Sequence, residues 1–263
     1  MASEAFSFGR NWDRFVREHY SDERVEISRG HLLNFLEVQD LSGKSFLDIG
    51  CGSGIHSLAA FRSGTIRVVS VDVDPFSVRA TKWVRERAGS PLAWEVHEGS
   101  ILDPEFVSRL EPADIVYSWG VLHHTGNLWE AIRHAAGRVS PGGFLYIAIY
   151  EKTPESPYWT DVKQRYNRAS ALRKRFMELG YVYRKFLRTK SPRTLLRNLR
   201  YIFGYRVTRG MAFWTDIRDW LGGWPYEPAT PEEVTGFCEG VTGLRTVKMK
   251  TGEANVEYLF ARG

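Results

Sequence analysis

Three glycines alternate with other residues directly after a predicted strand, in the segment Asp48 to Gly54 (DIGCGSG). Glycine at such positions lets the backbone turn tightly and approach a bound ligand, because a side chain would collide with that ligand. Gly50, Gly52 and Gly54 are therefore predicted to form a ligand-binding loop. Cys51, between two of them, is expected to pack in the loop beside the ligand and not to act as a nucleophile.

The residues around these glycines indicate which ligand the loop binds. A dinucleotide fingerprint GxGxxG that begins at Gly50 needs a glycine at position 55, where the sequence has Ile55. No Gly-Lys-Ser/Thr follows, which excludes a P-loop. Asp48, at the mouth of the loop, would repel a pyrophosphate and attract a cation. S-adenosylmethionine (SAM) has no phosphate and carries a sulfonium and an ammonium group, so the sequence favours SAM.

Residues downstream of the loop agree with a SAM site. Asp72 ends the second predicted strand about twenty residues later, where a carboxylate can accept both ribose hydroxyls. The segment Gly99 to Asp103 closes the third predicted strand, where a backbone N–H and a small polar side chain can meet the adenine edge. The cofactor contacts expected in this part of the chain are Val73, Ser100, Ile101 and Trp119. Trp119 either stacks over the adenine or lies in the core.

Two adjacent histidines, His123 and His124, follow the fourth predicted strand. Methyl transfer from a sulfonium is an in-line displacement that consumes positive charge, so alignment of the reactants supplies much of the catalysis, roughly 7 to 11 kcal/mol. A hydroxyl acceptor must also lose its proton, and a histidine, with an ordinary pKa of about 6.5, suits that task. His124 is the preferred candidate base and His123 the second. The alternative is that one or both hydrogen-bond the backbone of a loop.

These residues give the chain a resemblance to class I SAM-dependent methyltransferases of the small-molecule type, similar to the ubiquinone-pathway methylases. The resemblance covers roughly Phe46 to Tyr150 and lies in the following segments: Asp48 to Gly54, Asp72, Gly99 to Asp103, Val121 to His124 and Ser140 to Gly143. It implies an α/β fold with a Rossmann-like, doubly wound, seven-stranded sheet whose last strand is antiparallel. It also implies S-adenosylhomocysteine (SAH) as the product and SAM contacts at Asp48, Gly50, Gly52 and Asp72.

The elements that must position this site follow from the hydrophobic pattern. Short β-branched or aromatic runs alternate with helical stretches, which is typical of βαβ units in a mostly parallel sheet. The predicted strands are Ser45 to Ile49, Arg67 to Asp72, Leu92 to His97, Ile115 to Ser118, Phe144 to Tyr150, Leu244 to Lys250 and Val256 to Arg262. A helix is expected from Leu128 to Val139. The predicted parts are an N-terminal helical cap (1–40), a SAM-binding core (41–150), a basic helical insertion (151–229), and a C-terminal helix and strands that complete the core (230–263).

The insertion is strongly basic. From Lys163 to Arg209 it has fifteen Lys and Arg residues and one acidic residue, Glu178, a net charge of +14; the whole chain has +5, so the remainder has −9. A helical apolar stripe runs along it, formed by Leu172, Phe176, Leu179, Tyr183 and Phe186. The segment Trp214 to Pro231 is expected to be a loop.

An insertion at this point of the fold lies over the carboxyl ends of the strands, so it is expected to set substrate specificity. In one interpretation its apolar stripe packs on the domain and its cations are solvated. In a second, the cations bind an anionic or lipid-linked small molecule, and tyrosines suit a membrane surface: Tyr166, Tyr181, Tyr183, Tyr201 and Tyr205. In a third, the segment binds RNA.

Five residues are expected on the acceptor side of the site: Tyr150, Trp214, Asp216, Trp220 and Glu227. A structural role stays open for each of them, since tryptophans in Gly- and Pro-rich segments commonly anchor packing.

Several classes of function are disfavoured by what the sequence contains. Two distant cysteines without a CxxC motif argue against a disulfide framework, a zinc site, an iron–sulfur cluster and radical SAM chemistry. We expect no metal, because no acidic cluster stands at the strand ends. The strand end Ser118 to Gly120 lacks the Asn/Asp-Pro-Pro-aromatic motif of enzymes that methylate bases or glutamine. No apolar run of about 18 residues and no signal-peptide core occurs, so a cytoplasmic protein is expected.

The predicted function is therefore transfer of a methyl group from SAM to a small molecule, with a hydroxyl oxygen as the preferred acceptor. Two alternatives stay open: a tRNA or rRNA methyltransferase that uses the basic insertion, and a non-catalytic subunit with a SAM fold that only binds a partner.

Overall fold

The structure, a computed structural model, describes residues 8–189, 191–209, 213–252 and 254–263. Lys190 of the basic segment and the first seven residues of the predicted cap lie outside the described residues. The chain divides into two compact units, one comprising 157–224 and the other the remaining described residues. The second is called the core unit below, and the first the insertion unit.

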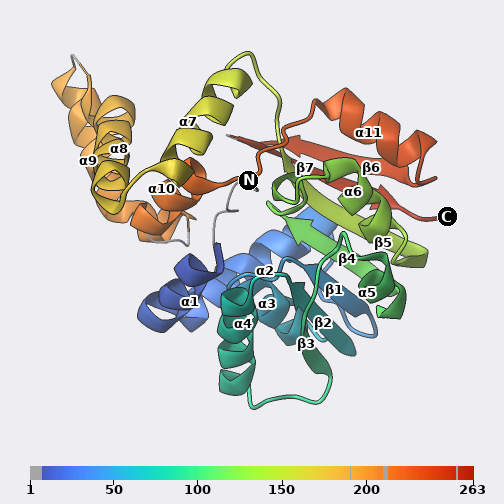
Figure 1. The fold of residues 1–263 in the computed structure, drawn as a ribbon. Helices are drawn as coiled ribbons and strands as arrows, with labels where there is room; N and C mark the ends of the chain where they lie inside the picture. The colour runs from blue at the N-terminus through green and yellow to red at the C-terminus, as the bar shows by residue number, and fades with distance from the viewer. Residues whose placement is uncertain (1–7, 190, 210–212, 253) are drawn as a thin grey trace. The chain divides into compact units, whose positions relative to one another are not determined.

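The core unit contains a seven-stranded sheet in the order β3-β2-β1-β4-β5-β7-β6 (Figure 1). Its strands are β1 (Ser45–Ile49), β2 (Arg67–Asp72), β3 (Trp94–Glu98), β4 (Ala113–Trp119), β5 (Val139–Tyr150), β6 (Arg245–Thr251) and β7 (Asn255–Ala261). Strands β1 to β5 pair in parallel, whereas β7 is antiparallel to both β5 and β6. The predicted α/β sheet with an antiparallel last strand is confirmed.

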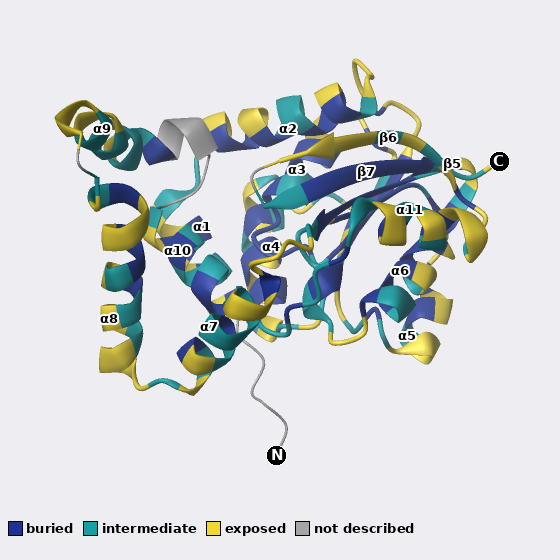
Figure 2. Cartoon of the chain, turned by 90° about the horizontal axis from the view of Figure 1, so that it is seen from above, coloured by how far each residue is buried: buried dark blue, intermediate teal, exposed yellow. Residues whose placement is uncertain are grey.

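Helices cover both faces of this sheet, which is why its central strands are buried along most of their length (Figure 2). On one face, α5 (Pro104–Arg109), α6 (Leu128–Ala136) and α11 (Pro231–Gly240) contribute to a single apolar cluster with the strands. On the other face, Phe35 of α2 (Asp22–Leu36) stacks on Tyr146 of β5 at 4.3 Å, and α2 contacts α3 (Ile55–Arg62).

The N-terminal helix α1 (Phe8–His19) is attached to α4 (Pro75–Arg87). Asp13 of α1 pairs with Arg79 of α4 at 2.7 Å, and the backbone N–H of Gly9 donates to the Asp74 carboxylate at 3.0 Å. Asp74 is also the N-cap of α4, followed by Pro75, as its sequence predicts. These contacts place α1 next to the carboxyl end of β2.

The insertion unit consists of α7 (Ser156–Arg168), which begins one residue before it, α8 (Ala171–Val182), a π-helical turn η2 (Tyr183–Leu187), α9 (Pro192–Arg209) and α10 (Phe213–Gly222). Its apolar cluster is Tyr166, Tyr181, Val182, Phe186, Ile217 and Leu221. Helix α10 occupies much of the segment predicted to be a loop; Ile217 and Leu221, four residues apart, bury one face of it.

The face of α8 that packs inside the insertion unit is not the apolar stripe of the sequence analysis. Leu172, Phe176, Leu179 and Tyr183 are exposed, whereas Met177, Tyr181 and Val182 on the opposite side contact the unit's interior. Phe186 does not share the exposed face with Leu172, Phe176 and Leu179. The chain forms a π-helical turn here, in which the N–H of Arg188 donates to the Tyr183 carbonyl, five residues earlier, at 2.7 Å. The longer turn rotates Phe186 toward the interior of the unit. No helix in the described parts of the chain is long and apolar enough to cross a membrane.

Candidate active site

The glycine loop begins where β1 ends and leads into α3. Its three glycines have φ angles of +79° (Gly50), +52° (Gly52) and +75° (Gly54), in the left-handed region that side chains disfavour. The N–H groups of Gly50 and Cys51 both donate to the Val71 carbonyl, at 2.7 and 3.0 Å, so the loop is held against the end of β2.

Gly54 has no space for a side chain. A Cβ at this position would lie 2.8 Å from the backbone Cα of Thr81, which cannot move aside as a side chain can. We expect Gly54→Ala to lower the free energy of unfolding by about 2 to 5 kcal/mol, from left-handed strain and overpacking. Denaturant unfolding of the full chain measures this.

Gly236→Ala, in α11, is the matched control, because nothing lies within 4 Å of its added Cβ. It should be neutral or stabilising, since alanine favours helix over glycine by up to about 1 kcal/mol. Equal unfolding free energies for Gly54→Ala and Gly236→Ala would show that the loop is not constrained as described.

Asp72 joins the glycine loop to the end of β2. Its carboxylate accepts from the N–H of Gly52 at 3.0 Å and from the N–H of Asp74 at 2.9 Å. Burial raises the pKa of Asp72 to about 6, although these backbone donors lower it. Each carboxylate oxygen has a second lone pair, so the group can hold the loop and still accept hydroxyl groups of a ligand.

The sequence predicts Asp48 at the mouth of the loop, and this prediction is wrong. The side chain of Asp48 is 2% exposed and accepts a hydrogen bond from Ser57 of α3 at 2.5 Å. The Ser57 hydroxyl also hydrogen-bonds that of Ser70 in β2 at 2.7 Å, so Asp48 links β1 to α3 and β2. Burial raises the pKa of Asp48 to about 7, and the nearby Asp72 carboxylate adds to this rise.

Trp12 of α1 is a neighbour of the loop that the sequence analysis did not single out. A Cβ on Gly52 would lie 3.1 Å from the Trp12 indole nitrogen, so the edge of this ring lies against the loop. The available signal was its place on the apolar side of an amphipathic N-terminal helix. That signal predicts that Trp12 packs but does not identify the surface it packs against.

An apolar surface lies beside Asp72. Val73 is 67% exposed, although it directly follows a core strand. At the end of β3, the N–H of Gly99 donates to the Asp72 carbonyl at 2.9 Å, which brings Ser100 and the buried Ile101 to the same edge of the sheet. This edge therefore combines a carboxylate with apolar surface, as a nucleoside requires.

Trp119 ends β4 and is turned toward α2. Its ring lies edge-on to His31 with centroids 6.5 Å apart, and it hydrogen-bonds to Glu257 of β7. Tyr146 also donates to Glu257. Trp119 thus belongs to a polar cluster with His31 and Glu257, on the face of the sheet that α2 covers. The sequence did not indicate this position.

The two histidines differ in their surroundings. His123 is fully buried, and its Nδ1 accepts from the N–H of Tyr150 at 3.4 Å, the backbone-bonding role described as the alternative. His124 is half-buried, and its Nδ1 lies 2.5 Å from the carbonyl oxygen of Pro225. A carbonyl oxygen only accepts, so Nδ1 of His124 carries a proton and Nε2 holds the lone pair of the neutral ring.

Aromatic rings surround His124. The ring of Phe8 lies 5.0 Å away and that of Tyr150, at the end of β5, 5.3 Å away, between centroids. Glu227 accepts from the N–H of Gly126 at 2.9 Å, so it stabilises the loop after His124, and burial raises its pKa. The core unit therefore brings together His124, Tyr150 and Glu227.

The remaining acceptor-side candidates belong to the insertion unit. Asp216 accepts a hydrogen bond from Tyr205. Trp220 packs edge-on against Trp159 with centroids 5.0 Å apart. Trp214 contacts the neighbouring Phe213 ring. Each of the three thus has at least one contact within its own unit.

Among the residues that the structure describes, no group of three or more His, Cys, Asp or Glu side chains is placed to hold a metal ion.

Comparisons with known proteins agree with this arrangement. Residues 14–204 match a family described as a methyltransferase domain. The ribosomal protein L11 methyltransferase of Vibrio parahaemolyticus is 43% identical over 116 residues, 44% of this chain and 37% of that protein. The ubiquinone biosynthesis O-methyltransferase of a Methylobacterium species is 30% identical over 133 residues, 51% of each chain. This chain thus spans about half, or less, of the length of these relatives.

A solved structure shares the fold. It is the magnesium protoporphyrin IX methyltransferase of Synechocystis PCC 6803 with bound SAH, with a TM-score of 0.54 and 14% identity, over 92% of this chain and 84% of that one. Because the family match covers more than half of the chain and the sheet has the expected order, the chain belongs to the class I SAM-dependent methyltransferases.

Proposed function

We propose that this protein transfers a methyl group from SAM to a hydroxyl oxygen of a small molecule, with His124 as the general base. The observation that carries this proposal is the hydrogen bond from Nδ1 of His124 to the Pro225 carbonyl, 2.5 Å long. This bond fixes the ring in the tautomer whose Nε2 can take a proton.

SAM is the methyl donor of the family, and its sulfonium supplies an electrophilic methyl group. The residues of the loop fit this cofactor: left-handed glycines give close access to the backbone, and Asp72 offers acceptors for the two ribose hydroxyls. Val73, Ser100 and Ile101 would hold the adenine. Asp48 would act indirectly, by fixing the loop through Ser57.

The work of the chain's own residues is alignment and proton removal. As the new carbon–oxygen bond forms, the acceptor hydroxyl gives its proton to Nε2 of His124, and SAH leaves with the electron pair of the broken carbon–sulfur bond. The Pro225 carbonyl stabilises the resulting imidazolium through Nδ1. The rings of Phe8 and Tyr150 limit the water around His124 and favour an acceptor with an apolar body.

The L11 methyltransferase relatives favour a second candidate, a protein acceptor. Their similarity covers less than half of this chain, and acceptor specificity in this fold resides largely in segments added to the SAM-binding core. The ubiquinone-pathway relative, in contrast, is named for a small-molecule pathway. We therefore give preference to a small hydroxylated acceptor.

Calorimetry with SAH, followed by a labelling screen, tests the proposal. The full chain is incubated with methyl-labelled SAM and separate pools of phenols, aliphatic alcohols, amines, ribosomal protein L11 and tRNA. We expect SAH binding and label in a hydroxylated small molecule. Label in L11 or tRNA instead would reassign the acceptor, and absence of SAH binding would support a non-catalytic subunit.

A further inference from the structure

Helix α8 has two apolar faces, and only one of them is used inside the insertion unit. Met177, Tyr181 and Val182 contribute to the unit's apolar cluster. The opposite face is exposed and consists of Leu172 (70% exposed), Phe176 (66%) and Leu179 (55%), continued by Tyr183 (57%) at the start of η2. The face formed by these four residues is called the outer α8 face below.

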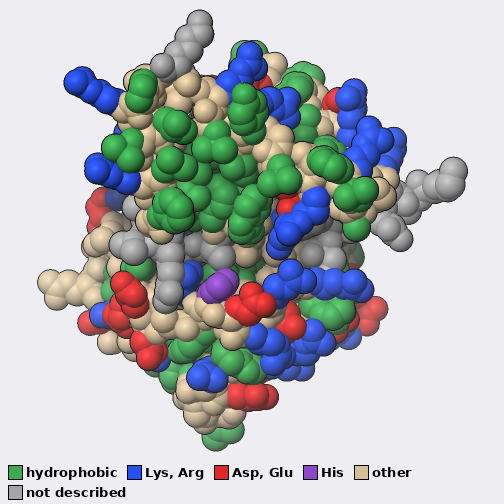
Figure 3. All heavy atoms as spheres, turned by 90° about the vertical axis from the view of Figure 1, so that its left-hand side faces the viewer, with side chains coloured by type: hydrophobic (Ala, Val, Ile, Leu, Met, Phe, Trp, Pro, Cys, Tyr) green, Lys and Arg blue, Asp and Glu red, His purple; other side chains and the backbone are tan. Residues whose placement is uncertain are grey.

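Cations border the outer α8 face. Arg173 and Arg175 stand on α8 itself and Arg184 follows Tyr183, and all three are exposed. Arg193, Arg197 and Arg200 of α9 are exposed as well. Figure 3 shows hydrophobic side chains gathered on one face, with Lys and Arg along their margins.

Between positions 163 and 209 the chain exposes no acidic side chain among the described residues. Glu178, the single acidic residue between positions 163 and 209, is buried and accepts from the Tyr166 hydroxyl at 2.8 Å. Lys163 is buried too, and burial lowers its pKa to about 7, so it adds little to the surface charge. The positive charge of the segment is thus carried mainly by its exposed arginines.

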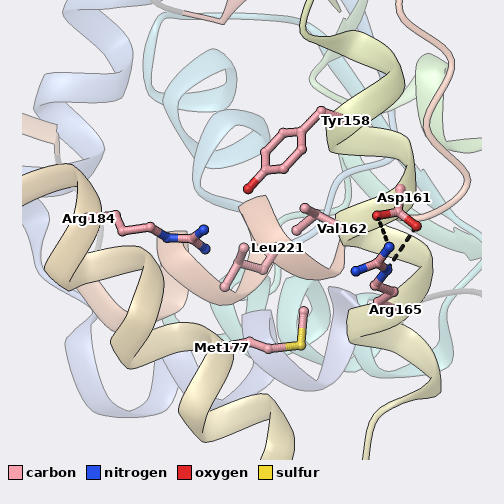
Figure 4. Close-up of a pocket in the computed structure, with 7 residues that line it drawn as sticks. All are labelled: Tyr158, Asp161, Val162, Arg165, Met177, Arg184 and Leu221. Atoms are coloured by element: carbon pink, nitrogen blue, oxygen red, sulfur yellow. Dashed lines mark hydrogen bonds and ion pairs between the residues drawn. The ribbon is translucent and has the colours of Figure 1, made fainter.

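A cleft of about 240 Å³ opens between α7, α8 and α10, on the side of α8 that carries Met177 (Figure 4). Its apolar lining includes Val162, Met177 and Leu221. Arg165 is paired with Asp161 at 2.8 Å. Arg184 of η2, whose Nε donates to the Gly180 carbonyl at 3.3 Å, extends from the other side of the cleft. An apolar floor beside a cation suits a phospholipid, with the phosphate at Arg184 and an acyl segment on the floor.

We propose that the outer α8 face docks the protein on an anionic membrane surface, with its apolar side chains in the boundary between headgroups and acyl chains. Exposed apolar residues bordered by arginines have the composition of interfacial helices. RNA fits less well, because leucine side chains do not stack on bases and three of the tyrosines that could stack, Tyr166, Tyr181 and Tyr205, are buried. This inference does not depend on the methyl acceptor.

Flotation of the full chain with phosphatidylcholine vesicles, with and without phosphatidylglycerol, tests the proposal. We expect binding to the vesicles that contain phosphatidylglycerol, weakened by added salt. Phe176→Ser with Leu179→Ser should reduce the partition coefficient at least about a hundredfold, from about tenfold for each buried side chain. Arg173→Gln with Arg184→Gln should reduce it about twenty-five-fold, from about fivefold for each charge near the surface.

Leu92→Ser is the matched control, because Leu92 is 96% exposed and lies in the core unit. It should bind like the unaltered chain, and all variants should keep its circular dichroism spectrum. The proposal is wrong if the unaltered chain does not bind anionic vesicles at low salt, or if Phe176→Ser with Leu179→Ser binds them equally well. Binding to tRNA without binding to vesicles would identify the face as an RNA surface.

Discussion

Replacing Asp72 with alanine is expected to weaken SAH binding by about 100-fold to 10,000-fold. Hydrogen bonds to a charged acceptor contribute about 1.5 to 3 kcal/mol each, and the two ribose hydroxyls would lose two of them. The variant also removes the acceptor for the Gly52 N–H, so the glycine loop loses one of its hydrogen bonds to the end of β2. Isothermal titration of the full chain with SAH gives the affinity directly.

Two further variants separate ligand contact from a general loss of structure. Asp72→Asn keeps one side-chain oxygen and should show an intermediate affinity. Asp40→Ala removes an exposed carboxylate from a loop of the same unit and should bind SAH like the unaltered chain. A less than threefold change in Asp72→Ala would rule out Asp72 as the ribose contact.

The same group predicts a dependence on pH. Burial raises the pKa of Asp72 to about 6 from its ordinary value of 3.8, and the ribose hydroxyls need the ionised form. SAH affinity should therefore fall about tenfold between pH 7 and pH 5. Stability changes in the opposite direction. Because the pKa of Asp72 is higher in the folded state than in the unfolded chain, its protonation stabilises the protein, fully so below pH 3.8. This stabilisation is lost as the pH rises through about 6. In Asp72→Asn, titration should show no such change of SAH affinity. Thermal unfolding should keep only a smaller pH dependence, which comes from Asp48, whose pKa burial also raises.

Much of the core sheet could be predicted because its signals are local. Short apolar runs, the capping residue Asp74 and the glycine loop each indicate one element and its place in the order. The boundary between α6 and β5 could not be predicted in this way. The helix ends at Ala136, not at Val139, because Val139 pairs with Ala113 of the neighbouring strand. That pairing depends on tertiary contact, which overrides local propensity.

The residue types of the site were easier to predict than the directions of their side chains. The sequence indicates that a carboxylate stands just before the loop, at Asp48, but not which way it points. Side chains alternate between the two faces along β1, and this alternation directs Asp48 toward Ser57 and away from the loop mouth. In the same way, helical spacing groups Leu172, Phe176 and Leu179 correctly on one face of α8. It does not distinguish this face from the opposite one, since both are apolar, and only packing of the other helices selects between them.

His124→Ala should reduce the turnover number about 100-fold to 10,000-fold, the range that a general base contributes, with the acceptor that the labelling screen identifies. SAH affinity should stay nearly unchanged, because the variant leaves Asp72 and the glycine loop, the groups proposed to hold the cofactor, unaltered. Steady-state kinetics together with SAH calorimetry measure the two quantities separately.

His124→Gln distinguishes proton removal from a structural role. A glutamine amide can still donate to the Pro225 carbonyl, as Nδ1 of His124 does, but it cannot accept a proton at neutral pH. The variant should therefore be as slow as His124→Ala and should lose the acidic limb of the pH–rate profile. His19→Gln, at the end of α1, serves as the control and should keep normal turnover. Full activity in His124→Gln would mean that the ring only supports the loop, and that the acceptor loses its proton to another group or to solvent.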